Sequence, residues 1–368
     1  MDGANKYIRN DAVSVAKGIA IILMVVAHTH CPLWLSSYIY MFHMPLFFFF
    51  SGYCFKAMYL ENTESFCKRR FRGLYWPYVK WGLVFLLLHN VFFYLNIYNM
   101  EYGFRGEVSH LYDIKEHMVT AISLITRMKG EEQLLGAYWF LHTMFFASFI
   151  FYLILFICKK KKVSAMYGII LIPLTILLLY TGKVLPYFDI GVRETLAAFF
   201  MLIGYCYKQK NLHVESYMSW IVIPICAGVV ALGANFWWGD MFHLNLFTIL
   251  PYILTALVGI LMVFSVSQTL LAKDRLRRLL TFIGNKTLPI LTWHFLSFKL
   301  ISLLIIMIYS LPYSRLAEFP VIEEYARLGW CWIYLMIGIS LPLLWSSVRF
   351  VKLNRYSFMW GFLFMLSV

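Results

Sequence analysis

The chain has 368 residues, of which 61% are hydrophobic and only 14% charged, and its mean hydropathy is +0.71. This composition supplies too little polar surface for a soluble globule, so it excludes most soluble enzyme folds and disordered scaffolds. The net charge is +14. In a soluble protein such basicity would favour nucleic acid as a partner, but here the cations lie in short loops between apolar segments, which is typical of membrane topology.

The ends and the cysteines give no sign of a secreted domain. The seven cysteines lie mostly inside apolar segments without a CxxC pair, which indicates neither a disulfide framework nor a metal site. The first residues, MDGANKYIRN, lead into an apolar run that lacks a small-residue cleavage site. We therefore expect a retained first helix rather than a signal peptide.

Apolar residues come in blocks of about 17 to 25, the length that crosses a hydrocarbon core of about 30 Å. These blocks predict an all-α, polytopic integral membrane bundle of about ten transmembrane helices. The predicted helices fall at residues 13–30, 38–57, 77–98, 139–158, 164–180, 191–207, 218–235, 245–267, 286–310 and 328–349.

Placing the N-terminus in the cytoplasm collects most basic loop residues on one side of the membrane. These residues are Lys6, Arg9, Lys68, Arg69, Arg70, Arg72, Lys159, Lys160, Lys161, Lys162, Lys208, Lys210, Lys273, Arg275, Arg277, Arg278, Lys352 and Arg355. The opposite loops carry little positive charge apart from Lys183, Arg315 and the connection after the third block. This bias predicts that both termini are cytoplasmic.

The connection after the third block, residues 99–138, contains apolar residues at helical spacing. They are Leu111, Ile114, Met118, Ile122 and Ile125. We interpret this segment as an extracytoplasmic loop with a helix on the membrane surface that acts as a lid, although an ordinary packed loop helix accounts for the pattern equally well. The rest forms a single membrane domain, residues 1–352, followed by a C-terminal segment, residues 353–368.

Ionisable residues inside membrane spans are costly and mark functional sites by default. The first span contains Lys17 and His28, which are eleven residues apart. This spacing separates them by about 16 Å and places them within about 20° of one helical face. The span would present a cation near the cytoplasm and an imidazole near the outer surface. A snorkelling lysine and a core histidine account for the same pattern in purely structural terms.

Further histidines occur in later spans. His43 and His142 are predicted at a depth similar to His28, and His89 and His294 lie deeper. Three histidines at one depth suit zinc, but no HxxxH or carboxylate spacing supports a site, so we expect no metal.

The segment KRRFRGLYWPY places four cations in five residues before the third span. These cations act as a topology signal, and arginine side chains also suit phosphoryl oxygens. Spacing alone leaves both interpretations open.

Five blocks resemble, in order, the signature segments of the integral-membrane acyltransferase 3 family. They are RNDAVSVAKGIAIILMVVAH, IYMFHMPLFFFFSGY, CKRRFRGLYWPY, AYWFLHTMFF and IGNKTLPILTWHF, and they span residues 9–295. The branch that the chain resembles most is that of fucose 4-O-acetylase-like and exopolysaccharide O-acyltransferases. The pairing of the basic-x10-His element with FHMPLFFFFSGY is the specific part of the resemblance.

The resemblance carries particular roles onto this sequence. The family's basic-x10-His pair falls on Lys17 and His28, its RxxR element on Arg69 and Arg72, its WFL on Trp139, Phe140 and Leu141, and its late histidine on His294. Family members take an acyl group from cytoplasmic acyl-CoA and acylate a glycan or a related acceptor. The resemblance therefore implies an O-acyltransferase of a bacterial inner membrane, which uses acyl-CoA, most often acetyl-CoA, and a carbohydrate acceptor, among membrane lipids and without a metal.

The sequence departs from the family pattern next to the central pair. Ser14 stands where the family has an acidic residue, three positions before Lys17, and Ala27 replaces the usual glycine before His28. Asp11 lies one turn earlier, on the cytoplasmic side, and is too far from His28 to orient it.

O-acyl transfer requires a base for the acceptor hydroxyl, and the pKa of histidine suits this task. We predict that His28 is this base, with a transiently acylated nucleophile as the alternative role. Lys17, Arg69 and Arg72 would neutralise the CoA phosphates, so that the pantetheine arm threads between helices. The predicted tunnel or acceptor-binding residues, each with core packing as the alternative, are His43, Ser51, Trp139 and His294.

Two other classes of function fit parts of the pattern. A transporter or flippase for a glycan or lipid-linked intermediate would also place polar groups inside ten helices. The lack of internal repeats and of acidic residues in the spans argues against it. A catalytically inactive subunit of a polysaccharide synthesis complex would account for the departure at Ser14.

Overall fold

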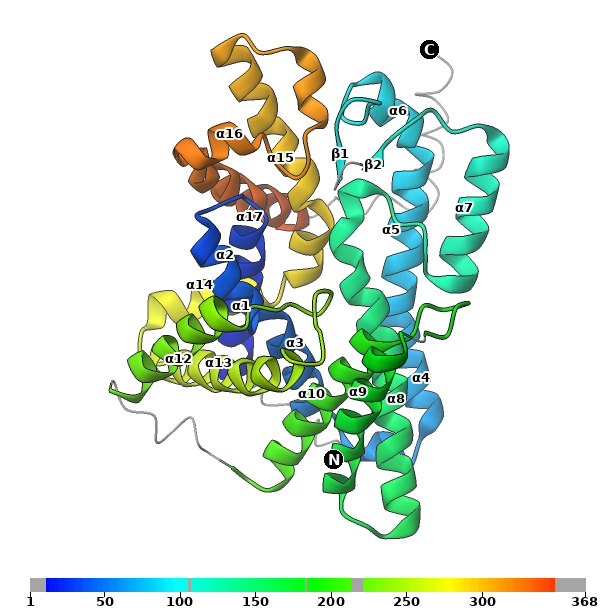
Figure 1. The fold of residues 1–368 in the computed structure, drawn as a ribbon, viewed down its shortest axis with the longest axis vertical. Coiled ribbons are helices and arrows are strands. Elements are labelled where there is room, and N and C mark those ends of the chain that lie inside the picture. The colour runs from blue at the N-terminus through cyan, green and yellow to red at the C-terminus, as the bar shows by residue number, and fades with distance from the viewer. Residues whose placement is uncertain (1–10, 105–106, 183, 213–220, 348–368) are drawn as a thin grey trace, which may run out of the picture.

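The computed structural model describes residues 11–104, 107–182, 184–212 and 221–347, and these residues form an almost entirely helical fold (Figure 1). Some predictions lie outside the described residues. They are those for the C-terminal segment, residues 353–368, for Lys6, Arg9, Lys183, Lys352 and Arg355, and for residues 105–106, 218–220 and 348–349 of the predicted loop and helices.

The N-terminal half contains the two-stranded β-ribbon and a series of helices. Its elements are α1 (Asp11–Ala27), α2 (Leu33–Tyr40), α3 (His43–Tyr53), η1 (Ala57–Leu60), α4 (Thr63–Arg70), η2 (Phe71–Tyr75), α5 (Trp76–Leu87), α6 (His89–Tyr94), β1 (Gly103–Phe104), β2 (Glu107–Val108), α7 (Ile114–Arg127), η3 (Gln133–Tyr138) and α8 (Trp139–Lys161). Strands β1 and β2 pair antiparallel, with Gly103 opposite Val108.

The C-terminal half contains only helices among the described residues. Its elements are η4 (Ala165–Ile170), α9 (Leu171–Thr181), α10 (Val192–Gln209), α12 (Val222–Phe236), α13 (Ile249–Leu270), α14 (Asp274–Gly284), α15 (Thr287–Tyr309), η5 (Tyr313–Ala317), α16 (Glu323–Tyr325), η6 (Ala326–Trp330) and α17 (Cys331–Ser347).

The described residues include five helical segments that are long and apolar enough to cross a membrane. They are Leu33–Tyr53, Gln133–Lys161, Ile249–Leu270, Thr287–Tyr309 and Glu323–Ser347. Each of the other predicted blocks also contains a helix, and Ala165–Thr181 and Val222–Phe236 are apolar but shorter. The all-α membrane architecture is thus supported, whereas the ten crossings and the cytoplasmic termini stay predictions.

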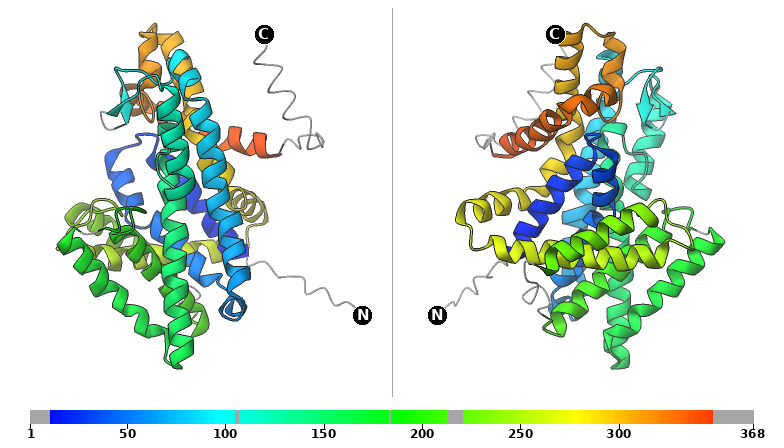
Figure 2. Two further views of the ribbon diagram at one scale, coloured as in Figure 1. Left: turned by 90° about the vertical axis from the view of Figure 1, so that its right-hand side faces the viewer. Right: turned by 60° about the vertical axis from the view of Figure 1, so that its left-hand side comes forward.

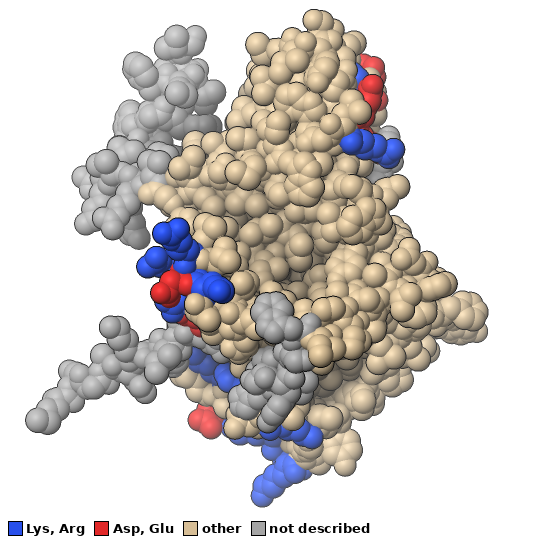
Figure 3. Space-filling view, turned by 90° about the vertical axis from the view of Figure 1, so that its left-hand side faces the viewer, with Lys and Arg blue, Asp and Glu red and all other residues tan. Residues whose placement is uncertain are grey.

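The surface has the composition expected next to lipid. Figure 3 shows a face on which charged side chains gather at the margins, with a broad area of other residue types between them. Large apolar side chains are exposed on several helices, including Leu254 on α13 and Met336 on α17. Extended exposed apolar surface of this kind marks contact with a membrane or a partner.

Helix α1 runs through the middle of the molecule (Figure 2). It packs against α2, α3, α13, α14, α15 and α17. Glycines allow its closest contact: a Cβ at Gly18 would lie 2.3 Å from the backbone oxygen of Leu280, and one at Gly284 would lie 1.9 Å from that of Ser14. The backbones of α1 and α14 therefore touch, which fixes the N-terminal half of α1 relative to the bundle.

The basic segment before the third block is helical rather than a loop. Asn62 caps α4 by accepting a hydrogen bond from the backbone N–H of Ser65 at 2.9 Å, and the helix continues through the π-helical turn η2 into α5. The cations of KRRFR therefore project from a rigid helix. Arg69 and Arg72 are exposed on it.

Helix α7 forms in the predicted segment and lies beside α5 (Figure 1). Asp113 and Glu116 form a capping box at its start, and the hydrogen bond with His110 lowers the pKa of Glu116 from its usual value. The Tyr75 hydroxyl donates to the carbonyl of Ile125 at 2.7 Å. The apolar side chains of Ile114, Met118 and Ile122 are exposed, and their placement on the outer membrane surface stays a prediction.

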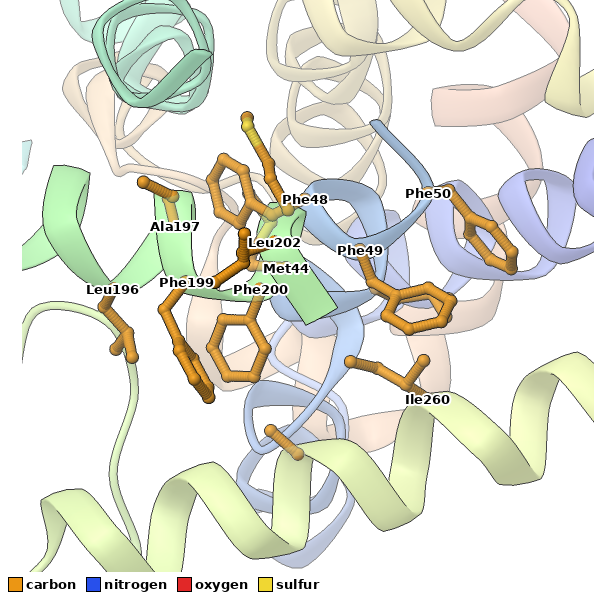
Figure 4. Packing of buried hydrophobic residues seen from close by; sticks show 14 of the residues in the cluster. Met44, Phe48, Phe49, Phe50, Leu196, Ala197, Phe199, Phe200, Leu202 and Ile260 are labelled. Carbon is orange, nitrogen blue, oxygen red and sulfur yellow. The ribbon is translucent and has the colours of Figure 1, made fainter. Parts of the chain in front are cut away.

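A second tight crossing joins α3 to α10. A Cβ at Gly52 would lie 1.7 Å from the backbone oxygen of Met201, and one at Gly204 would lie 2.0 Å from that of Phe49. Figure 4 shows the aromatic side chains of both helices packed around this crossing, with Ile260 of α13 beside Phe49. The small residues let two bulky helices approach closely enough for their side chains to interdigitate.

This crossing makes a testable prediction about stability. Gly52→Ala should lower the free energy of unfolding by about 1–3 kcal/mol, because the added methyl group meets backbone that cannot rotate away. Thermal unfolding of the protein in detergent measures the effect. Gly228→Ala in α12 is the control, since nothing lies within 4 Å of its Cβ position, and it should be neutral or stabilising. Equal stability of the two variants would contradict the packing described here.

Candidate active site

A cavity of about 1070 Å³ lies where α1 ends, and His28 lines it. The segments that form the cavity wall lie far apart in the sequence. They are the residues after α1, the start of α3, the β1–β2 ribbon, the strap that follows it (residues 109–112), the approach to α8, the loop before α13, and α15. Representative lining residues are His28, His43, Tyr112, Glu132, Trp139, Phe242, Tyr252 and Phe295. This volume lies at the upper end of the range of about 300–1,000 Å³ that is usual for small-molecule sites.

His294 lies directly behind His28. Their ring centroids are 5.6 Å apart with planes at 32°, and Phe295 contacts His28 edge-on at 5.0 Å. The Nδ1 of His294 lies 3.0 Å and 3.1 Å from the carbonyl oxygens of Ile290 and Leu291, and its buried Nε2 has no partner among the described residues. Because a carbonyl only accepts, Nδ1 carries the proton, and Nε2 of the neutral ring offers a lone pair.

His43 is held in the same manner on the other side of the cavity. It is buried, and its Nδ1 donates to the carbonyl of Ile39, one turn earlier, at 2.9 Å. His30 also lines the cavity, and its Nδ1 lies 3.5 Å from Glu323. Three imidazoles from the segments flanking α2 and one from α15 therefore converge on this end of the molecule.

The remaining predicted site residues fall into two groups. Trp139 lines the cavity and meets Phe242 edge-on at 4.7 Å. Ser51, Lys17 and the pair Arg69 and Arg72 do not belong to its lining. The residues predicted to bind the acyl donor therefore lie outside the cavity that His28 lines. The ranges that the structure describes contain no group of three or more His, Cys, Asp or Glu able to hold a metal ion.

Asp11 does not reach the cavity. Its carboxylate lies 3.6 Å from Arg277 of α14. Asp11 therefore contributes to the contact between α1 and α14, at the opposite end of α1 from His28.

One feature that the sequence analysis missed is the buried pair of His89 and Glu132. The imidazole donates to Glu132 at 2.8 Å and to the carbonyl of His110 at 2.9 Å, and it stacks on Tyr112 with centroids 3.7 Å apart. Asn90 exchanges two hydrogen bonds with the backbone of Tyr112, both at 2.9 Å. These contacts fasten the strap after β2 to α6 and fix one wall of the cavity. Two adjacent acidic residues directly before an apolar block are the signal that could have revealed it.

The second missed feature is a charged cluster at the start of α10. Arg193 lines the cavity, pairs with Asp189 at 3.0 Å, and lies over the ring of Phe242 at 4.7 Å. Glu194 is fully buried and accepts hydrogen bonds from Thr143 at 2.8 Å and from the N–H of Gly191 at 2.9 Å. Two charges at the edge of an apolar block were visible in the sequence, but their partners were not.

Comparison with known protein families identifies the family of this chain. One family model matches residues 10–349. It describes an acyltransferase domain, that of the acyltransferase 3 family. No curated protein and no solved structure matches the chain. The match covers nearly the whole chain and includes both the cavity and the basic helix, so the chain belongs to the acyltransferase 3 family of membrane acyltransferases, which join an acyl donor to an acceptor.

Proposed function

We propose that the protein transfers an acetyl group from cytoplasmic acetyl-CoA to a hydroxyl of a surface glycan or lipid-linked saccharide at the outer face of a bacterial inner membrane. The observation that carries this proposal is the position of His28. It ends the central helix, lines the large cavity, and has the unprotonated nitrogen of His294 behind it.

The reaction requires one base. His28 takes the proton from the acceptor hydroxyl as the oxygen attacks the thioester carbonyl carbon. The tetrahedral intermediate then collapses, the C–S bond breaks, and the CoA thiolate receives the proton from His28. An ester and free CoA result, and the imidazole returns to its starting state.

His294 serves His28 as a positioning residue. In the proposed reaction the unpaired Nε2 of His294 would accept a hydrogen bond from an N–H of His28, which would leave the other nitrogen of His28 unprotonated towards the cavity. The centroids of the two rings lie 5.6 Å apart, so the two imidazoles are neighbours at the cavity.

The acyl donor binds at the other end of α1. Lys17 lies on α1, eleven residues before His28, which directly follows the helix. That distance is about 16 Å, so a long pantetheine arm is needed to bring the thioester to the imidazole. Arg69 and Arg72 present guanidinium groups from a rigid helix next to the π-helical turn η2, a feature frequent at functional sites.

Replacement of His28 tests the proposal directly. His28→Ala should lower acetyl transfer at least a hundredfold, because no other group at this position takes the hydroxyl proton. The assay follows the release of CoA from acetyl-CoA labelled in its acetyl group, with and without a surface-glycan fraction.

His117→Ala is the matched control, since His117 lies on α7 outside the cavity lining. It should retain the activity of the unmodified protein. Full glycan-dependent release by a folded His28→Ala protein would refute the proposal.

The donor site makes a separate prediction. Replacing both Arg69 and Arg72 by alanine should raise the KM for acetyl-CoA about tenfold and leave kcat within about twofold, because charge-assisted hydrogen bonds to phosphates are lost while the reacting groups stay in place. Acetyl-pantetheine, which lacks the nucleotide phosphates, should show no such change. Arg127→Ala on α7 is the control, and an equal loss with both donors would contradict a phosphate-binding role.

A further inference from the structure

Two neutral polar groups in the cavity wall have no hydrogen-bond partner among the described residues. The hydroxyl of Tyr252 on α13 and the side-chain Nε2 of Gln133 at the start of η3 are both buried and unpaired. Tyr252 is fully buried, and both residues belong to the cavity lining. Buried polar groups are nearly always paired, so unpaired ones at a cavity wall are candidates for hydrogen bonds to a ligand.

Most charged groups of the cavity wall have partners within the protein, whereas Glu107, on β2, is exposed. Glu132 pairs with His89 and Glu131 accepts from Tyr78 at 2.8 Å. Across the cavity, Asp240 accepts from His243 at 2.9 Å, and Arg193 pairs with Asp189. A charged ligand would have to compete for the paired groups, whereas a neutral ligand can bind the unpaired hydroxyl and amide without breaking an ion pair.

Aromatic rings also line the cavity. Phe242 is covered on one side by the guanidinium of Arg193 and meets Trp139 edge-on, and Trp238 lies nearly parallel to His243 at 5.8 Å. Trp139, Trp238 and Phe242 all belong to the cavity lining. Flat aromatic surface beside a few fixed hydrogen-bonding groups suits a molecule with one apolar C–H face and a rim of hydroxyls.

We propose that Tyr252 and Gln133 form an acceptor subsite for a neutral sugar ring, one that carries neither a carboxylate nor an amino group. The Tyr252 hydroxyl and the Gln133 amide bind hydroxyls or the ring oxygen, the aromatic side chains cover a C–H face, and another hydroxyl reaches His28. This subsite rests on the proposed function, because it supplies the hydroxyl that His28 would deprotonate.

Binding without acyl donor tests the subsite. The probes are methyl glycosides of neutral hexoses, of hexuronic acids and of 2-amino-2-deoxyhexoses, and saturation-transfer NMR on the full-length protein in detergent measures the affinity of each. Neutral glycosides should bind best. Tyr252→Phe should weaken their binding about tenfold, and Gln133→Leu should do the same.

Tyr334→Phe is the matched control. Tyr334 is also fully buried, but its hydroxyl is bonded to Ser302 at 2.9 Å and it does not line the cavity. This variant should keep the affinity of the unmodified protein. Unchanged affinity in both folded variants, Tyr252→Phe and Gln133→Leu, would overturn the subsite, as would absent binding of every neutral glycoside or tighter binding of a uronide or amino sugar.

The two proposals fail in different experiments. His28→Ala should abolish transfer and keep glycoside affinity. If transfer depends on His28 but Tyr252→Phe and Gln133→Leu bind like Tyr334→Phe, the subsite is wrong and the proposed function stands. If glycoside affinity depends on Tyr252 but His28→Ala transfers acetyl groups at the normal rate, the proposed function is wrong and a sugar site remains.

Discussion

The central packing of α1 is the constraint on which the rest of the structure depends. This helix contacts six other helices, and its backbone touches that of α14 through Gly18 and Gly284. A helix held so closely cannot slide or rotate, so the separation between Lys17 and His28 is fixed by the rise of the helix itself. The distance from Lys17 to the cavity is thereby built into a single helix. The loops around α1 do not set this distance.

The distribution of polar groups follows from the apolar surroundings. Where few polar partners are available, a buried charge is costly unless it is paired, and the fold accordingly pairs His89 with Glu132 and surrounds Glu194 with donors. Four neutral groups, on His294, Tyr252, Gln133 and Thr281, are buried without a partner among the described residues. Tyr252 and Gln133 line the cavity and His294 adjoins His28, whereas Thr281 lies on α14 outside the cavity lining. Most of these neutral groups are therefore found at the cavity or next to it.

Hydropathy was sufficient to predict where the helices lie, because each apolar block needs backbone hydrogen bonds within itself. It was not sufficient for α4, whose basic residues resemble a loop in composition but follow an Asn62 cap and continue into α5. The histidine at the end of α1 was visible from its spacing to Lys17. The pairing of His89 with Glu132 was not, because the two residues are 43 positions apart and meet only when the strap folds over α6. Tyr252 was also invisible, since nothing in the sequence of an apolar helix distinguishes an unpaired tyrosine from a packed one.

The choice of partner for His28 can be understood from the same surroundings. A carboxylate beside the imidazole would strongly stabilise the protonated form of His28. In a poorly solvated cavity the carboxylate itself would also have to stay ionised from one turnover to the next, which is costly. A second imidazole whose Nδ1 proton is held by two backbone carbonyls, as in His294, is neutral and needs no counter-ion. In the proposed mechanism it would fix the orientation and tautomer of His28 while exerting a weaker pull on the proton that passes to the leaving thiolate. In this chain the acidic residue of the family pattern is absent at Ser14, and Asp11 is engaged by Arg277 at the far end of α1. A neutral partner from α15 is therefore the arrangement that an apolar helix bundle can maintain at least electrostatic cost.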